Sequence, residues 1–241
     1  MHYAIISDIH GNLQALRAAL EVLEQKSIDQ YVCLGDIVGY GANPNECVHL
    51  IRTLTDKVLI GNHDHAALGL TDIDYFNPYA REAVVWTAEQ LSPESKDFLG
   101  RLPFKLERGG YLFVHSTPGR PEQWRYILSP YQALEAFDEF GGVVCFIGHS
   151  HQPVVFIRGR DRVEWTISDS VSLSPGERYI VNVGSIGQPR DGDPRASFCI
   201  FDADKGEIEI IRSEYDIAAA QKAIRQADLP EILAERLGYG R

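Results

Sequence analysis

Five short apolar segments of this 241-residue chain each stop directly before a side chain of a type that binds metals. The segments, with the residue that follows each, are 3–7 before Asp8, 31–35 before Asp36, 58–61 before Asn62, 111–114 before His115 and 143–148 before His149. Strands of a parallel-rich sheet bring their carboxyl ends to one edge, where open α/β sheets bind ligands. We therefore expect these five side chains to meet in a metal site.

The composition is ordinary for a globular chain, with 44% hydrophobic and 24% charged residues. We expect a single domain over residues 1–241, with a helical cap or flank inserted at about 66–106 and a lid at about 116–140. No apolar stretch approaches the roughly 18 residues of a membrane helix, and the first residues have no pattern of an export signal. We therefore expect a cytoplasmic protein with no membrane partner.

The net charge of −11 argues against duplex nucleic acid as a partner, because such binding usually needs a basic surface. Bound divalent ions would add positive charge that this count omits, so an anionic substrate is compatible with it. The cysteines have no CxxC spacing, and we expect them to be reduced, buried thiols. They are Cys33, Cys47, Cys145 and Cys199.

Residues 3–62 alternate between strand-like and helix-like segments, the order that builds a parallel sheet from βαβ units. One helix is expected after Asn12. A second is expected after Asn43, with Pro44 in its first turn and Glu46 completing a capping box. Both helices would follow directly on a loop that carries metal-ligand residues.

Residues 66–106 have a helical pattern, and a further helix is expected from Ser129. The later chain is rich in strand-like segments, which we assign to a second, mostly antiparallel sheet. These segments are 154–158, 164–167, 171–173, 178–183, 197–202 and 207–213. An amphipathic helix is expected over 216–238.

The metal-ligand residues belong to five short motifs. They are Asp8-Ile9-His10, Gly35-Asp36, Gly61-Asn62-His63-Asp64, His115 and Gly148-His149-Ser150-His151. Together they resemble the calcineurin-like metallophosphoesterases, which have DxH, GD, GNH[DE], a lone histidine and GHxH in this order. The resemblance covers residues 8–151 and suggests a small bacterial phosphodiesterase-type member. It implies an α/β fold, a four-layer αββα sandwich of two mixed β-sheets flanked by helices.

Carboxylate, imidazole and amide oxygen ligands suit Mn, Fe, Zn, Ni or Co, and the absence of thiolates argues against a structural zinc site. Two such ions can bind a hydroxide nucleophile and clamp a phosphoryl group. The resemblance implies two ions that share Asp36 as a bridge. One would be held by Asp8, His10, Asp36 and His151, and the other by Asp36, Asn62, His115 and His149.

The resemblance places His63 outside the metal shell, as the general acid that protonates the leaving group. Asp64 is expected to orient the ring of His63. Two substrate contacts are also expected. Arg190 lies in a segment similar to the NxGS…PR segment of small bacterial members, and Tyr40 is a candidate for stacking on a base.

Each residue has a simpler explanation by itself. Asp8 and Asn62 are typical turn formers, and His115 alone would be read as a packed core histidine. The joint pattern favours metal binding, since five of the eight histidines fall in the motifs. His65 follows the third motif but matches no element of it, so we leave it out of the site.

The leading hypothesis is a dimetal-dependent phosphodiesterase that acts on a small-molecule phosphate ester, in particular a nucleotide. Hydrolysis of diadenosine tetraphosphate or another polyphosphate is an alternative, and so is a protein Ser/Thr phosphatase. The phosphatase is disfavoured because the arginine of GDxVDRG is absent from 35–41 and the position before Gly61 is Ile60. A noncatalytic metal-binding scaffold is the non-enzyme alternative, although no motif element is missing. The native substrate, ions and oligomeric state stay open.

Overall fold

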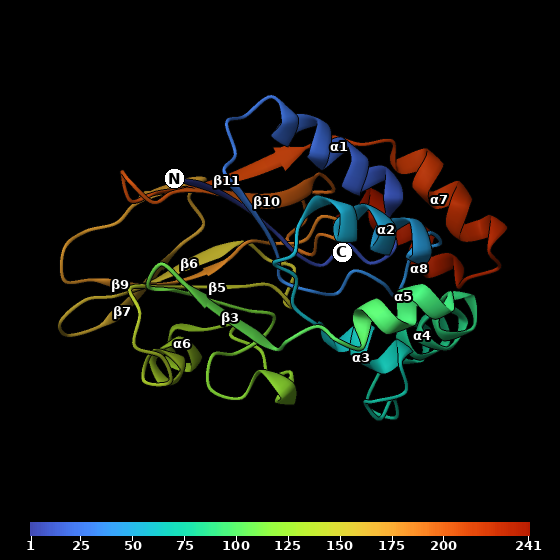
Figure 1. Cartoon of the computed structure of the whole chain (residues 1–241), viewed down its shortest axis with the longest axis horizontal. Helices are drawn as coiled ribbons and strands as arrows, with labels where there is room; N and C mark the ends of the chain where they lie inside the picture. The colour runs from blue at the N-terminus through green and yellow to red at the C-terminus, as the bar shows by residue number, and fades with distance from the viewer.

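The computed structural model describes residues 1–241 as two mixed β-sheets that lie face to face, with helices on both outer sides (Figure 1). The first sheet has the strand order β2 (Gln30–Cys33), β1 (His2–Ile6), β10 (Ala196–Asp202), β11 (Glu207–Ser213), β8 (Ser170–Ser172). The second has the order β3 (Lys105–Arg108), β4 (Tyr111–Val114), β5 (Val144–Ile147), β9 (Arg178–Asn182), β6 (Val154–Arg158), β7 (Val163–Thr166). The expected four-layer fold class is confirmed.

Parallel pairing is confined to the strands that lead into the motifs and to β9. β1 pairs with β2 in parallel, as do β4 with β5 and β5 with β9, while every other strand pair is antiparallel. The prediction of a separate antiparallel sheet was wrong. β8, β10 and β11 extend the first sheet, and β6, β7 and β9 extend the second (Figure 1). A strand's own pattern shows which faces it buries but does not name its partner.

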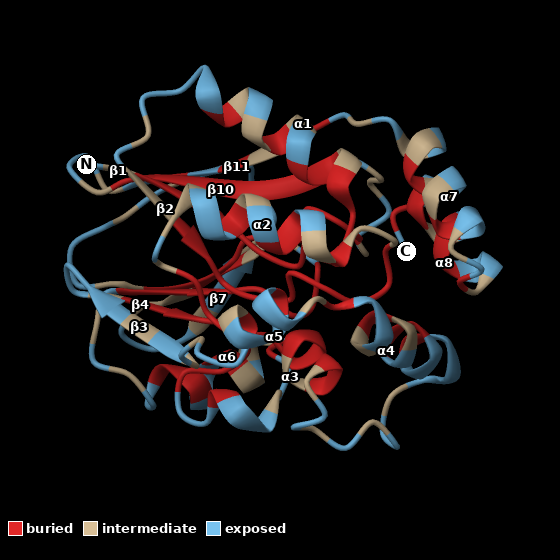
Figure 2. Ribbon diagram, turned by 45° about the vertical axis from the view of Figure 1, so that its right-hand side comes forward, coloured by how far each residue is buried: buried red, intermediate tan, exposed pale blue.

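The alternation of side chains along β1 explains why the layers stack in this order. Ala4 and Ile6 pack toward the outer helices, while Tyr3 and Ile5 pack between the two sheets. Helices α1 (Leu13–Glu24) and α2 (Pro44–Leu54) cover the first sheet, and α6 (Pro130–Phe137) covers the second. Figure 2 shows the buried residues concentrated in the strands and on the inner faces of these helices.

The helices begin where the capping residues predict. The side chain of Asn12 accepts a hydrogen bond from the backbone nitrogen of Ala15 at 3.1 Å, and Ser129 caps α6. Asn43 is the N-cap of α2, but its side chain makes no capping hydrogen bond, so the expected capping box is not formed. The fixed backbone of Pro44 at the first helical position is sufficient there.

Residues 66–106 contain the end of α3 (Asn62–Ala67), then α4 (Pro78–Gln90), α5 (Pro93–Leu99) and the start of β3. The prediction of one continuous helix over 216–238 was wrong. The structure has α7 (Ile217–Gln226), α8 (Glu231–Glu235) and a 3-10 turn, η2 (Arg236–Gly238). Pro230 cannot continue a helix and lies directly before α8, which explains the break.

All four cysteines are buried free thiols, as expected. None of the helices has the length and apolar character that crossing a bilayer requires.

Candidate metal centre

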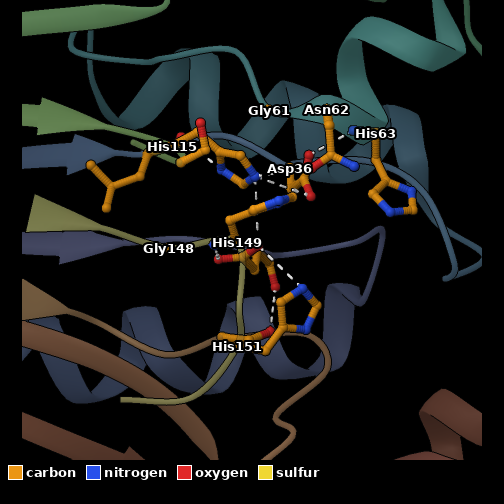
Figure 3. A network of polar contacts seen from close by, with 12 residues as sticks. Asp36, Gly61, Asn62, His63, His115, Gly148, His149 and His151 are labelled. Atoms are coloured by element: carbon orange, nitrogen blue, oxygen red, sulfur yellow. Dashed lines mark hydrogen bonds and ion pairs between the residues drawn. The ribbon is translucent and has the colours of Figure 1, made fainter. Parts of the chain in front are cut away.

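The motif residues converge between the two sheets, at the carboxyl ends of β1, β2, β4 and β5 (Figure 3). This corrects the expectation of one parallel-rich sheet, because β1 and β2 belong to the first sheet whereas β4 and β5 belong to the second. Residues 58–61 do not form a full strand, since only Val58 makes a bridge, to Cys33. The centre is thus enclosed by loops from both sheets, and α3 begins at Asn62 beside it.

The backbone of this region is held in an unusual conformation. Asp8, His10, Asp36, His149 and His151 all have positive φ angles, between 51° and 67°. A left-handed backbone costs roughly 1–2 kcal/mol for a residue that has a Cβ atom. Such strain persists only where the surroundings impose it, and it clusters at functional sites.

The first cluster of side chains comprises Asp8, His10, Asp36 and His151, all buried. The Nε2 atoms of His10 and His151 are 3.1 Å apart. His151 Nε2 lies 3.2 Å from Asp8 Oδ1, and His10 Nε2 lies 3.6 Å from Asp36 Oδ2. Four potential ligands therefore surround one point.

The second cluster comprises Asp36, His115 and His149, also buried. His115 Nε2 lies 3.4 Å from Asp36 Oδ2 and 3.2 Å from the side-chain oxygen of Asn62 (Figure 3). Asp36 belongs to both clusters, so its carboxylate is placed where a bridge between two ions would be.

Hydrogen bonds to backbone carbonyls fix the orientation of the four imidazoles. The Nδ1 atoms of His10, His115 and His151 contact the carbonyl oxygens of Val38, Leu34 and Gln188 at 3.2, 3.2 and 2.6 Å. A carbonyl only accepts, so each Nδ1 carries a proton and each Nε2 is directed to the centre, where it presents a lone pair when the ring is neutral. In His149 the roles are reversed, because its Nε2 contacts the carbonyl of Trp124 at 2.8 Å.

These donor atoms fit a cation. The facing lone pairs of His10 and His151 repel each other unless a positive charge lies between them. Burial lowers the pKa of both rings and keeps them neutral. At His115 burial has the same tendency, but the Asp36 and Asp8 carboxylates outweigh it and raise its pKa to about 9. The first cluster therefore combines neutral imidazoles with buried carboxylates, and the raised pKa of His115 reflects carboxylates that favour a positive charge in the second cluster, as metal sites do.

His63 lies at the border of the centre. Its backbone nitrogen donates to Asp36 Oδ1 at 2.8 Å, and its ring lies against those of Tyr40 and His10, with centroids 4.4 and 4.8 Å away. Its Nδ1 atom is buried and has no hydrogen-bond partner within the chain. Burial lowers the pKa of His63 to about 4.

Asp64 does not orient His63, contrary to expectation. Its two carboxylate oxygens accept hydrogen bonds from the backbone nitrogens of Gly61 and Val38, both at 3.0 Å. An acid at this helix position reaches back readily to the N-cap amide, which ties up the carboxylate. Burial and the nearby Asp36 carboxylate raise the pKa of Asp64 to about 7. The residue holds the loop before α3 in place.

Arg190 and Tyr40 lie together beside His63. A terminal nitrogen of Arg190 donates to the Gln188 side chain at 2.8 Å and to the Tyr40 hydroxyl at 3.3 Å. Tyr40 is only 6% exposed, and its ring is enclosed by His10, His63 and arginine side chains. The ring thus presents no open face for stacking on a base.

The sequence analysis did not single out Tyr126. Its ring stacks on His149 with a centroid distance of 4.0 Å and an interplanar angle of 14°, and it is 44% exposed. The proline-rich and aromatic character of residues 118–126 was the available signal. His65 contacts Thr71 and the rings of Phe104 and Trp124, and it belongs to neither cluster.

A groove of about 780 Å³ opens beside the centre. It shares Ser150, Gln152 and Arg190 with the surroundings of the GHxH motif. Its apolar wall includes Trp165 and Ile167.

The fold and the histidine-rich centre define a protein of the metallophosphoesterase type. Residues 1–206 match the calcineurin-like phosphoesterase superfamily domain, and the chain belongs to that superfamily.

Three comparisons illustrate the relationship. A protein of Methanocaldococcus jannaschii, described as uncharacterized, is 43% identical over 242 residues, which cover 99% of this chain and 98% of the relative. The crystal structure of a metallophosphoesterase from Sphaerobacter thermophilus has a TM-score of 0.88 and 42% identity, covering 100% of this chain and 99% of that one. A symmetrical bis(5′-nucleosyl)-tetraphosphatase of Psychromonas ingrahamii is 38% identical over 63 residues, which cover 25% of this chain and 23% of that protein. The family resemblance seen in the motifs is confirmed.

Proposed function

We propose that the protein is a dimetal-dependent phosphodiesterase that hydrolyses a nucleotide-like small-molecule phosphate ester. Membership of the superfamily supports phosphoester hydrolysis. The observation that carries the proposal is the convergence of imidazole lone pairs on two buried carboxylates, Asp8 and Asp36. A noncatalytic scaffold has no need of such a complete ligand set.

Two divalent ions would share Asp36. Asp8, His10 and His151 would complete one ligand set, and Asn62, His115 and His149 the other. When bound, such ions stabilise negative charge on a phosphoryl group and make water a nucleophile at neutral pH. The ligands suit Mn, Fe, Zn, Ni or Co, with manganese the first ion to test.

The chain's own contribution to catalysis would come from His63. Its ring lies against that of His10 beside the two clusters, in a position to give a proton to a leaving oxygen once a negatively charged substrate raises its pKa. Asp64 would act as a positioning residue, because it fixes the backbone at Gly61 and Val38. Arg190 would contact the phosphate ester, and Tyr40 would hold Arg190 in place rather than stack on a base.

We also propose that the chain is one cytoplasmic domain, that residues 66–106 form a helical flank, and that 116–140 include a lid. The lid proposal is supported by Trp124 and Tyr126, which contact His149. The second half of that segment is α6, which packs on the outer face of the second sheet. The moving part would therefore end before Ser129.

Hydrolysis of diadenosine tetraphosphate is the second candidate, and the 63-residue match to a bis(5′-nucleosyl)-tetraphosphatase favours it. A panel of a phosphomonoester, a phosphodiester, a cyclic nucleotide and a dinucleoside polyphosphate, each with Mn, Ni, Co, Zn and Mg, tests both candidates. We expect metal-dependent cleavage with the diester or the polyphosphate as the best substrate. No cleavage of any ester with any ion would overturn the proposed function.

A further inference from the structure

Two arginines that have no aspartate or glutamate partner lie against the ring of Tyr40. The Cζ atoms of Arg190 and Arg236 lie 5.7 and 5.9 Å from the ring centroid. Several other arginines of the chain form ion pairs, for example Arg225 with Glu231 and Arg212 with Asp191. Neither Arg190 nor Arg236 forms an ion pair with an aspartate or glutamate of the chain, in contrast to these two arginines.

The unused hydrogen-bonding groups of these arginines point to an anion. The Nε atom of Arg190 is buried and has no partner. Arg236 donates from its Nε to the main-chain oxygen of Arg241, the last residue of the sequence, and its two terminal nitrogens make no hydrogen bond within the chain. Burial and the charge of Arg190 lower the pKa of Arg236. Two partly buried like charges are costly to keep together unless an anion binds between or beside them.

The pair lies directly beside the metal centre. The ring of Tyr40, which both arginines contact, lies with its centroid 4.7 Å from that of His10 and 4.4 Å from that of His63. The backbone nitrogen of Arg190 donates to the carbonyl of His151 at 3.2 Å. An anion at the arginines would therefore be a neighbour of a phosphate group held at the metals.

We propose that Arg190 and Arg236 bind the phosphate groups that follow the scissile one in the substrate. Planar guanidinium groups match phosphate oxygens, and two of them suit a chain of phosphates better than a lone diester. The inference rests on the proposed function and narrows it. The substrate class is a nucleotide with two or more linked phosphates, of which a dinucleoside polyphosphate is one example.

The first test compares two substrates of the manganese-loaded protein, diadenosine tetraphosphate and bis(p-nitrophenyl) phosphate, which has a single phosphate. Arg236→Gln should lower kcat/KM for the tetraphosphate by about 10- to 100-fold, the effect of losing a charge-assisted hydrogen bond. The same variant should change kcat/KM for the single-phosphate ester by less than about 2-fold, since only the distant phosphates reach the arginine. Arg236→Lys should retain part of the kcat/KM for the tetraphosphate that Arg236→Gln loses.

Arg225→Gln is the matched control, because it removes a positive charge from the same C-terminal helices but from an exposed ion pair with Glu231. Arg225→Gln should leave kcat/KM unchanged for both substrates. Equal losses on both substrates in Arg236→Gln would assign the arginine to structure and overturn the subsite. So would an unchanged rate on the tetraphosphate.

The second test does not depend on turnover. Calorimetry on the manganese-loaded protein would compare methylenediphosphonate, a non-hydrolysable diphosphate, with orthophosphate. Arg236→Gln should weaken the binding of the diphosphonate by about 10-fold or more and leave the affinity for orthophosphate unchanged. If the affinities for both ligands fall equally, or if neither affinity falls, the proposed subsite is wrong. If the wild-type protein cleaves no ester of the substrate panel with any ion, the proposed function fails, while this binding measurement still decides the subsite.

Discussion

The metal centre and its rim are built from different kinds of structure. All seven proposed ligands are at most 7% exposed and extend from strand ends or from the first residue of α3. The rim, which we define as Tyr126, Arg190 and Arg236, comes from loops and a 3-10 turn, and Tyr126 is 44% exposed. The difference suggests a division of labour, in which the rigid centre sets the chemistry and the rim selects the substrate.

The largest effect is expected at the shared carboxylate. Asp36→Asn removes the negative charge that both ligand clusters share, so both ions should bind more weakly or be lost. Turnover of bis(p-nitrophenyl) phosphate should fall by at least about 10⁴-fold, since the metals supply both charge stabilisation and the nucleophile. Metal analysis by mass spectrometry checks the cause. Asp97→Asn, at an exposed pair with Arg101, is the control.

His63→Ala separates catalysis from metal binding. Turnover should drop by about 10²- to 10⁴-fold, as is usual for loss of a general acid, while both ions stay bound. His49→Ala removes an exposed imidazole of α2 and should keep its activity. Undiminished turnover in the His63 variant would refute the acid role, and loss of metal would show that the residue serves the centre instead.

Gly61→Ala tests how rigid the centre is. A methyl group there would collide with the backbone nitrogen and carboxylate of Asp36. The free energy of unfolding should fall by about 1–3 kcal/mol or more, and metal affinity should fall with it. Gly141→Ala meets no atom within 4 Å and should cost little. Chemical denaturation of both variants makes the comparison, and equal stabilities would contradict the account.

The smallest effect is expected at the rim. Tyr126→Ala removes a ring that stacks on His149. The loss of one aromatic contact should raise KM by about 2- to 10-fold and leave the metal content unchanged. Tyr131→Ala, which removes an exposed ring of α6, should have no effect on KM. A large loss of metal in the Tyr126 variant would place the ring in the centre rather than the rim.

The same division decides what could be predicted from the sequence. The convergence of the proposed ligand residues was predictable because they follow strand-like segments, and chemistry limits the side chains that can bind metals there. The pairing of β10 with β1 was not predictable, because local pattern shows burial and not the partner strand. The role of Asp64 was predicted wrongly, because its carboxylate accepts hydrogen bonds from two backbone amides that the sequence does not place beside it. Arg236 carries no motif, and only the packing of the C-terminal helices brings it to Tyr40.

The central claim is that two ions share one carboxylate. Anomalous diffraction from crystals of the manganese-loaded protein tests it most directly. We expect two anomalous peaks in contact with Asp36, one also contacting Asp8, His10 and His151 and the other contacting Asn62, His115 and His149. A single peak, or two peaks of which one does not contact Asp36, would contradict the account.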